Sequence, residues 1–497
     1  MAFVIDQNAL LEDLFAKRAL VYELHGNDDL FLLHLNSFVY RVMSEMGLVF
    51  LHEPVFVVLS ELITNSLKAC AKRVFFKKQG LDLNNAVDYE KGMTSFRSEV
   101  LEKWDSQGLQ LRQHSFRVLL SATLTDTGLQ VVIQNNVAVV AYERDRIEKR
   151  MNVALRGMDL SVNVAESIDI SEGGGLGLLL SRLLLQNTGI GSENLKFLMN
   201  EHGTQMILFI PKQVSRPVVA DHVSKKIIER IDTLPVFPDH VHRLVVLCES
   251  ERADLSIITS HIVKDPVLAA QILKLAGSAG YVGNNKNLSL LEAVRIIGLN
   301  QVRSFLFVAG ARTVLSSRLP KEKMEEVWSN SNRVSFFAGQ LAKGNREVKE
   351  TAIVAGLLSD LGRIIAYSFG DEDYHKLRRL TGRENIDVQT VIEETTLGIS
   401  YAELGAMLGK KWNFPENILY TIQNQMRPLH VEESKIDFVY PVYLARCMAD
   451  VLSAKQQFEF IEYRVLKMYD LVGREKFNAR LAELEQRFRS QYEHVHS

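Results

Sequence analysis

Two stretches of the chain carry residue types and spacings suited to phosphate chemistry. The first, Ser171–Arg182, holds Gly173, Gly174, Gly175 and Gly177 just before a strongly apolar run. Glycine has no Cβ, so such a loop can adopt positive φ and bring backbone N–H groups close to an anion. A helix that follows adds the partial positive charge of its N-terminus. We expect either a phosphate-binding loop or an ordinary tight turn here.

The second stretch is Val55–Ala71, an apolar helix-like segment with a polar side. Glu61 and Asn65 are four residues apart and Lys68 is three further on, so all three project from one helix face. The carboxylate can orient or deprotonate a water, the amide oxygen is a hard ligand for Mg²⁺, and the lysine offsets phosphate charge. This face is a candidate metal–phosphate site, and the alternative is an ordinary polar helix face.

The elements around these stretches read as a mixture of helices and strands. Helical spacing runs through residues 8–50, and a densely charged, solvated helix is expected at 141–152. Residues 76–113 are polar and look like an insertion. Strand patterns then occur at Ser115–Leu124, Gly128–Gln134 and Thr204–Ile210.

In this order, the motifs resemble the GHKL fold of ATP-binding domains, which includes gyrase and the histidine kinases. Ser60–Ala69 is similar to its N-box, Gly173–Leu178 to its second glycine box and Gly203–Pro211 to its third. The resemblance covers roughly residues 30–212. It implies an α+β domain over residues 1–213, with a Bergerat-type mixed sheet and helices on one face.

The resemblance also implies that the site takes ATP and Mg²⁺. Glu61 would be the general base and Asn65 would reach Mg²⁺ through the nucleotide. The other residues that would bind nucleotide are Lys68, Asn135, Gly173, Gly174, Gly175, Gly177, Gly203 and Thr204.

One motif departs from the family. The family places Asp-x-Gly-x-Gly after a strand, where the aspartate accepts a hydrogen bond from the adenine amino group. Here Asn135 takes the place of the aspartate, and Val137 and Val139 take the places of the glycines. An amide oxygen still accepts, but without the charge that strengthens the bond. The valines add bulk and resist positive φ.

From a linker at residues 214–224 onward, the sequence is helical throughout. Asp265 before Pro266 predicts a helix N-cap, and Gly298 predicts a helix end. Over residues 225–455 several short sequence segments, in this order, resemble the HDOD domain. This is an all-α output module of bacterial signalling proteins, related to HD phosphohydrolases. The segments that carry this resemblance are Lys264–Leu268, Glu292–Leu299, Val327–Ser331, Ala355–Gly362, Tyr401–Ala406 and Lys411–Pro415.

The resemblance implies that the metal ligands of HD enzymes are replaced in this chain. The positions of the expected histidines and of the later aspartate hold Asn330, Ser359, Tyr401, Asn424 and Arg446. Only Asp360 remains, and one carboxylate beside an arginine cannot hold a hydrolytic metal. We therefore expect no HD-type metal and no phosphodiesterase activity, with Asp360 acting as a packing or capping acceptor.

The bulk composition sets the remaining expectations. The 497 residues predict more than one domain, and the formal net charge of −2 gives no basic field for nucleic acid or a membrane. The three cysteines form no C-x-x-C pair, no apolar run looks long enough to span a bilayer, and the first residues do not resemble a signal peptide. A cytoplasmic protein is expected, with a helical C-terminal tail at 456–497.

Three functions remain open from the sequence. The first is a non-catalytic signalling regulator, in which a degenerate ATP-binding domain is joined to an HDOD domain that contacts other signalling proteins. The second is an active GHKL ATPase or protein kinase that uses HDOD for targeting. The third is a scaffold that binds no nucleotide. By analogy, two such domains in one chain also suggest a homodimer.

Overall fold

The computed structural model describes most of the chain, in two compact units that we treat separately. Described are residues 7–24, 29–100, 114–152, 176–214, 229, 231, 237–250, 254–265, 268–269, 272–273, 289–315, 320–344, 346–368, 390, 393–394, 399–453 and 456–492. The first unit contains residues 7–214 and also 456–464. The second contains 237–368, 399–453 and 465–492.

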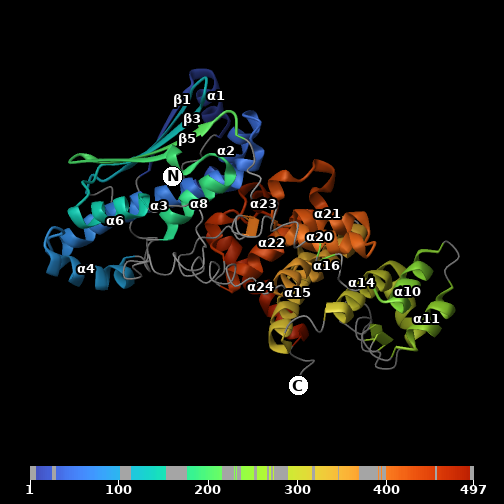
Figure 1. Ribbon diagram of the computed structural model, residues 1–497. Helices are drawn as coiled ribbons and strands as arrows, with labels where there is room; N and C mark the ends of the chain where they lie inside the picture. Colours follow the sequence, from blue (N-terminus) through green and yellow to red (C-terminus); the bar gives the residue numbers. More distant parts are fainter. Residues whose placement is uncertain are drawn as a thin grey trace. The chain divides into compact units, whose positions relative to one another are not determined.

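The first unit is built on a five-stranded sheet (Figure 1). Its strands, in spatial order, are β1 (Ala19–Leu24), β2 (Val118–Leu124), β3 (Gly128–Asn135), β5 (Gly203–Pro211) and β4 (Leu195–Asn200). All four pairings of these described strands are antiparallel. The expected mixed sheet is therefore corrected to an antiparallel one. Each strand joined to its spatial neighbour by a short turn, as β2 is to β3, must run antiparallel to it.

Alternation of side chains along the strands explains which face of the sheet is covered. In β3, Leu129, Val131 and Ile133 are buried while Gln130 between them is exposed. The same alternation buries Met206, Leu208 and Ile210 in β5. Side chains of period two place these residues on one face, which packs against the helices.

The helices of the first unit lie on that buried face, with α3 and α8 below the sheet in Figure 1. They are α1 (Gln7–Lys17), α2 (Asp29–Glu45), α3 (His52–Gln79), α4 (Ala86–Glu99), α6 (Ala141–Met151) and α8 (Leu176–Thr188). The longest is α3, which ends where Gly80 takes the left-handed conformation at φ 64°. Glycine is favoured there because it has no Cβ to clash.

The stretch Val49–Gln79, which contains α3, is long and apolar enough to cross a membrane by length and composition. Such a stretch was not expected from the sequence, because the polar face of Glu61, Asn65 and Lys68 interrupts its apolar residues. In the structure, 72% of its most apolar window is buried inside the protein, as in the core helix of a folded domain.

The predicted insertion at 76–113 is partly described, and that part is tied to the core by aromatic side chains. Phe96 of α4 lies edge-on to Phe75 at 5.6 Å between ring centroids. The Tyr89 ring lies 6.0 Å from the Phe76 ring. Such pairs bury apolar area and favour these tilted geometries. The described part of 76–113 therefore extends the hydrophobic core of the first unit.

The second unit is helical throughout its described residues. Its helices are α10 (Asp239–Glu249), α11 (Leu255–Ile262), α13 (Leu290–Ile297), α14 (Leu299–Leu315), α15 (Lys321–Leu341), α16 (Arg346–Leu357), α17 (Leu361–Ser368), α20 (Tyr401–Lys411), α21 (Glu416–Asn424), α22 (Ile436–Leu452) and α24 (Arg474–Tyr492), with most of α23 (Tyr463–Met468). Helix ends in this unit follow the usual capping preferences. Asp265 Oδ1 accepts from Leu268 N at 3.0 Å, which confirms the predicted cap, and Gly298 ends α13 at φ 85°.

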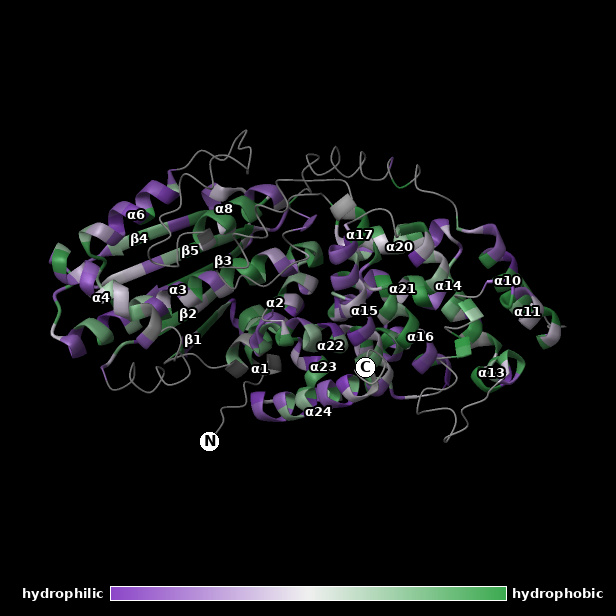
Figure 2. Ribbon diagram, turned by 90° about the horizontal axis from the view of Figure 1, so that it is seen from below, coloured by the Kyte–Doolittle hydropathy of each residue, from purple (hydrophilic) through white to green (hydrophobic). Residues whose placement is uncertain are grey.

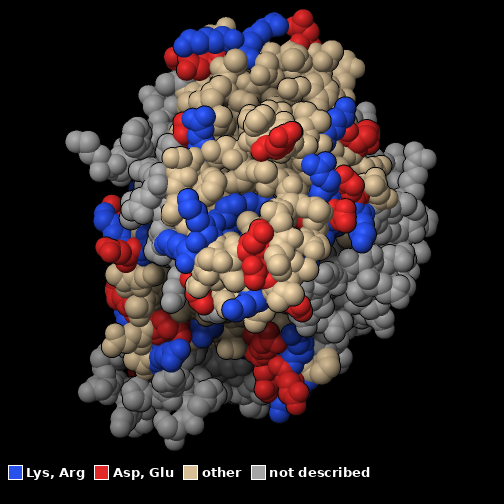
Figure 3. Space-filling model, turned by 90° about the vertical axis from the view of Figure 1, so that its left-hand side faces the viewer, with Lys and Arg blue, Asp and Glu red and all other residues tan. Residues whose placement is uncertain are grey.

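Charges of both signs are mixed on the face of the molecule that Figure 3 shows. On the side of the molecule that carries α4 and α6, lysine and arginine side chains are interspersed with aspartate and glutamate (Figure 3). The α6 ribbon is almost entirely hydrophilic in Figure 2. The side chain of Glu143 in α6 is nevertheless only 13% exposed.

Candidate functional site

The polar face predicted on α3 is present in the first unit. Glu61, Asn65 and Lys68 are half-buried, and Asn65 Nδ2 donates to Glu61 Oε1 at 2.8 Å. This bond fixes the amide so that its oxygen points away from the carboxylate. Lys68 shares the helix face, but within the described part of the chain it has no hydrogen bond to either residue.

Gly177 in the first turn of α8 packs against this face. A Cβ built at Gly177 would lie 1.8 Å from Glu61 Oε1, which is far inside van der Waals contact. Only glycine therefore leaves room for the carboxylate at this point of α8. The N-terminal end of a helix carries partial positive charge, so the Glu61 carboxylate is electrostatically favoured there. Gly173, Gly174 and Gly175 lie outside the described residues.

A second group of predicted residues lies where β3 and β5 pair. Asn135 and Thr204 are cross-strand partners, and both are buried. Gly203 has φ 154°, and a Cβ there would lie 2.1 Å from the Asn135 carbonyl oxygen. Glycine at 203 thus allows the two strands to approach closely, whether or not a ligand is bound.

The side chain of Asn135 is already engaged by its own chain. Its Oδ1 atom accepts a hydrogen bond from Val137 N at 3.3 Å. Val137 itself is 3% exposed and belongs to the core of the unit. The amide oxygen expected to receive adenine therefore supports a local turn, and the valine in place of the first glycine serves packing.

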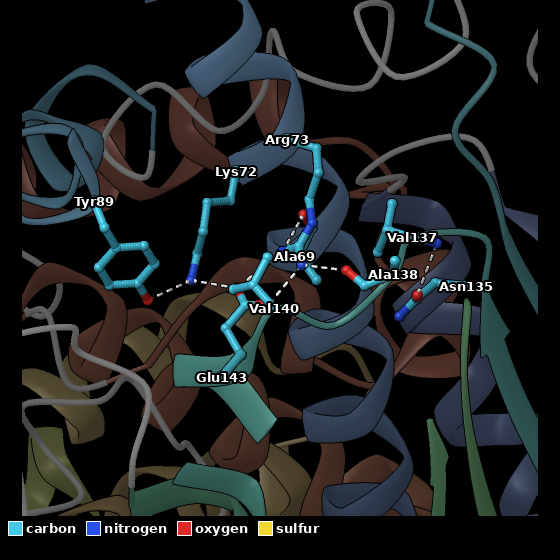
Figure 4. A network of polar contacts seen from close by, with 9 residues as sticks. All are labelled: Ala69, Lys72, Arg73, Tyr89, Asn135, Val137, Ala138, Val140 and Glu143. Atoms are coloured by element: carbon cyan, nitrogen blue, oxygen red, sulfur yellow. Dashed lines mark hydrogen bonds and ion pairs between the residues drawn. The ribbon is translucent and has the colours of Figure 1, made fainter. Parts of the chain in front are cut away.

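A buried ionic network joins α3, α4 and α6, and the sequence reasoning missed it (Figure 4). Glu143 Oε1 accepts from Lys72 Nζ at 3.0 Å and from Arg73 Nη1 at 2.9 Å. Lys72 Nζ also lies 3.4 Å from the Tyr89 hydroxyl. Residues 141–152 were expected to form a solvated helix, whereas the Glu143 side chain is only 13% exposed.

The protonation of this network follows from burial and charge. Burial alone would raise the pKa of Glu143, but the charge of Lys72 and the bonds from Arg73 outweigh it and lower this pKa to about 2. Burial lowers the pKa of Lys72, an effect that the Glu143 carboxylate opposes. A signal was available in the sequence, because an adjacent Lys-Arg pair within a buried helix requires a carboxylate partner.

The network holds the segment that follows β3. Arg73 Nη2 donates to the Ala138 carbonyl oxygen at 2.6 Å, and Val140 N donates to Glu143 Oε2 at 3.4 Å. This segment carries Val137 and Val139, at the positions where the resemblance to GHKL domains led us to expect glycines. Its conformation is therefore set by buried protein contacts.

In the second unit, the one retained carboxylate of the HD set is buried among polar partners. Asp360 is 2% exposed, and its Oδ2 atom accepts from Asn330 Nδ2 at 3.2 Å and from Ser331 Oγ at 3.3 Å. Its Oδ1 atom lies 3.2 Å from Arg363 Nη1. Asp360 thus acts as the packing acceptor that the sequence analysis expected.

Arg446 supplies the remaining contacts of this cluster. Its Nη2 atom lies 2.7 Å from Asp360 Oδ1, its Nε atom 3.2 Å from Asp450 Oδ2, and its Nη1 atom donates to Ser359 Oγ at 3.3 Å. The predicted replacements Asn330, Ser359 and Arg446 are therefore brought together around Asp360. The Tyr401 ring lies 5.9 Å from the Arg363 guanidinium carbon, whereas Asn424 donates to the Tyr420 carbonyl of its own helix.

The charges of this cluster do not fit a divalent metal. Burial would raise the pKa of Asp360, but the guanidinium groups of Arg363 and Arg446 hold it below its usual range. The carboxylate is thus ionised and already paired with two cations. Across the residues that the structure describes, no three His, Cys, Asp or Glu side chains are grouped to hold a metal ion. A cation added beside Arg446 would meet repulsion in a low-dielectric site.

Comparison with known proteins identifies the second unit. Residues 234–428 match the family model of the HDOD domain. An uncharacterized protein of Treponema pallidum (strain Nichols) is 27% identical over 435 residues, which cover 87% of this chain and 84% of that protein. An alignment of that length includes residues on both sides of the HDOD match.

Two solved structures are also similar to this chain. An HDOD domain protein with unknown function from Geobacter sulfurreducens is 20% identical, covers 54% of this chain and 97% of its own, and has a TM-score of 0.43. A candidate signal transduction protein from Marinobacter aquaeolei VT8 is 19% identical, covers 60% of this chain and 74% of its own, and has a TM-score of 0.41. The C-terminal half of this chain carries an HDOD domain, which follows an N-terminal region with a five-stranded antiparallel sheet.

Proposed function

We propose that this protein is a cytoplasmic signal-transduction regulator of bacterial type. Its HDOD domain acts by binding another signalling protein and hydrolyses nothing. Its first unit, which resembles GHKL domains, binds ATP with Mg²⁺ and so makes the output responsive to nucleotide. Nucleotide can change the output only if it binds two arrangements of the protein with different affinity.

The contact between Arg446 and Asp360 carries the first part of this proposal. An HD hydrolase needs a metal where this chain has a guanidinium bound to its last carboxylate at 2.7 Å. What remains is a helical domain whose former site is a packed, charge-balanced core. Such a domain offers surface for partners rather than chemistry. A chromogenic phosphodiester tests this part: no metal-dependent hydrolysis is expected, and hydrolysis that Asp360→Asn abolishes would contradict it.

The contact between Glu61 and Gly177 favours the nucleotide part. A carboxylate, an amide and a glycine at the start of a helix come together on one side of α3. There Asn65 would reach Mg²⁺ through its free amide oxygen, and Glu61 would orient a water; bound Mg²⁺ would neutralise phosphate charge. Asn135 and Val137 weaken adenine recognition, because one is engaged locally and the other is buried.

Calorimetry with Mg-ATP on the full chain separates this regulator from its alternatives. The regulator predicts heat of binding without phosphate release, lost in Asn65→Ala and retained in the control Glu148→Ala on the exposed side of α6. Phosphate release that Glu61→Ala abolishes would instead indicate an active ATPase or kinase. No heat at millimolar nucleotide would indicate a scaffold.

A further inference from the structure

A short segment near the C-terminus packs in the first unit although its neighbours in sequence belong to the second. We call residues 456–464 the strap; it follows α22 and leads into α23 and α24. It includes the 3-10 turn Phe458–Phe460, and Phe458 and Ile461 are buried.

Two aromatic contacts anchor the second half of the strap. The Phe460 ring lies edge-on to Phe56 of α3 at 6.0 Å between centroids. The Tyr463 ring lies 4.3 Å from the His34 ring of α2. These contacts supply apolar burial that does not depend on the ionisation of a carboxyl group.

Between these anchors the strap buries one carboxyl group, that of Glu462, which is 1% exposed. Glu462 Oε1 accepts from Ser37 Oγ at 2.5 Å and from Arg464 N at 3.2 Å, and Oε2 accepts from Asn36 Nδ2 at 3.0 Å. These three donors are neutral groups. Taking a carboxylate out of water is costly, and neutral donors offset that cost less than a cation in direct contact would, so burial favours the protonated carboxyl at this site.

The charged and titratable groups around Glu462 come from each element packed against it. On the strap itself, the charge of Arg464 favours the ionised carboxyl. On α2 and α3, the Asn36 oxygen lies 2.8 Å from His52 Nε2, and Tyr40 lies edge-on to His52. Burial outweighs the donors and Arg464, and it raises the pKa of Glu462 to about 7.

We propose that Glu462 is a proton-controlled clasp, whose neutral carboxyl holds the strap in the sheet-containing unit and whose ionised form releases it. The direction of the pH effect follows because proton binding to Glu462 and holding of the strap are thermodynamically linked. When the strap leaves, the carboxyl regains an ordinary pKa near 4.5. The holding free energy is then complete below pH 4.5 and falls as the pH rises through about 7.

Hydrogen exchange of the full chain tests the clasp, with rates of strap amides corrected for the intrinsic effect of pH. Holding weakens about tenfold for each pH unit between the released pKa of 4.5 and the held pKa of about 7, and it levels off above that. Strap protection is therefore expected to fall about tenfold between about pH 6 and about pH 8. Glu462→Gln mimics the neutral carboxyl, so it should keep the protection at both pH values. The control Glu45→Gln, on the exposed side of α2, should behave like the wild type.

Two results would overturn the clasp. One is strap protection that does not change between the two pH values in the wild type. The other is a pH dependence that persists in Glu462→Gln, which would assign it to His34 or His52. Neither result bears on nucleotide binding or on the HDOD site, so the clasp stands or falls separately from the proposed function.

Discussion

Arg446 Nη2 lies 2.7 Å from Asp360 Oδ1, and both side chains are at most 4% exposed. A buried ion pair of this kind pays a large desolvation cost that only the partner's charge offsets. The two guanidinium groups of Arg446 and Arg363 thus stabilise the ionised carboxylate of Asp360 inside the helical unit.

Removing one member of this pair should destabilise the helical unit severely. Arg446→Ala is expected to lower its free energy of unfolding by about 3 to 5 kcal/mol, because a buried carboxylate loses its closest cation. Urea unfolding followed by the fluorescence of Trp328 and Trp412 measures this in a Trp104→Phe background. The control Arg480→Ala, which breaks a surface pair with Glu483, should change the stability far less, because solvent screens an exposed pair. Equal losses in the two variants would contradict the account.

Glycine at 177 should be required only because Glu61 lies against it. Gly177→Ala is expected to cost about 1 to 3 kcal/mol, since its Cβ would overlap the carboxylate. In a Glu61→Ala background the same change should be close to neutral. A double-mutant cycle from thermal unfolding gives the coupling. An equal cost of Gly177→Ala in both backgrounds would place the constraint elsewhere.

The ionic network at Glu143 should stabilise the first unit in a pH-dependent way. The carboxyl has its pKa lowered to about 2, so its stabilisation is present above 4.5 and is lost as the pH falls towards 2. Glu143→Gln should therefore cost about 2 to 3 kcal/mol near neutral pH and much less in acid. Far-ultraviolet circular dichroism during thermal unfolding measures the difference from wild type. A difference that stays constant with pH would show that charge is not its cause.

The hydroxyl of Ser37 should set the pH at which the strap opens. It donates to Glu462 and so favours the ionised carboxyl. Ser37→Ala should move the midpoint of strap opening up by about half to one pH unit. Hydrogen exchange over a pH series gives the midpoint, and Ser44→Ala on the exposed side of α2 is the matched control. A midpoint that stays in place or falls would exclude this role for Ser37.

Local sequence patterns correctly predicted those elements that are determined by interactions between residues close in sequence. The alternation in Gly128–Gln134 gave β3, and Asp265 and Gly298 marked helix ends where the structure has them. The strand β1 was missed because its leucines also fit the helical spacing of the residues around it. These residues form a strand because they pair with β2, nearly a hundred residues further along the chain. A local sequence pattern does not show such a distant pairing.

Residues that act through distant partners were the hardest to predict. Glu143 looked solvated because its neighbours in α6 are charged, and only the approach of Lys72 and Arg73 buries it. Glu462 lies 425 residues from Ser37, so nothing near it in sequence shows that it is buried. By contrast, the cluster around Asp360 was predicted from a family motif, which already encodes long-range positions.

The binding of Mn²⁺ to the nucleotide-free chain, followed by the electron spin resonance signal of the free ion, tests the central claim most directly. The account predicts that stoichiometric protein leaves the free-ion signal unchanged, because Arg446 occupies the cation position beside Asp360. A loss of signal equal to one ion per chain, restored by Asp360→Asn, would contradict it.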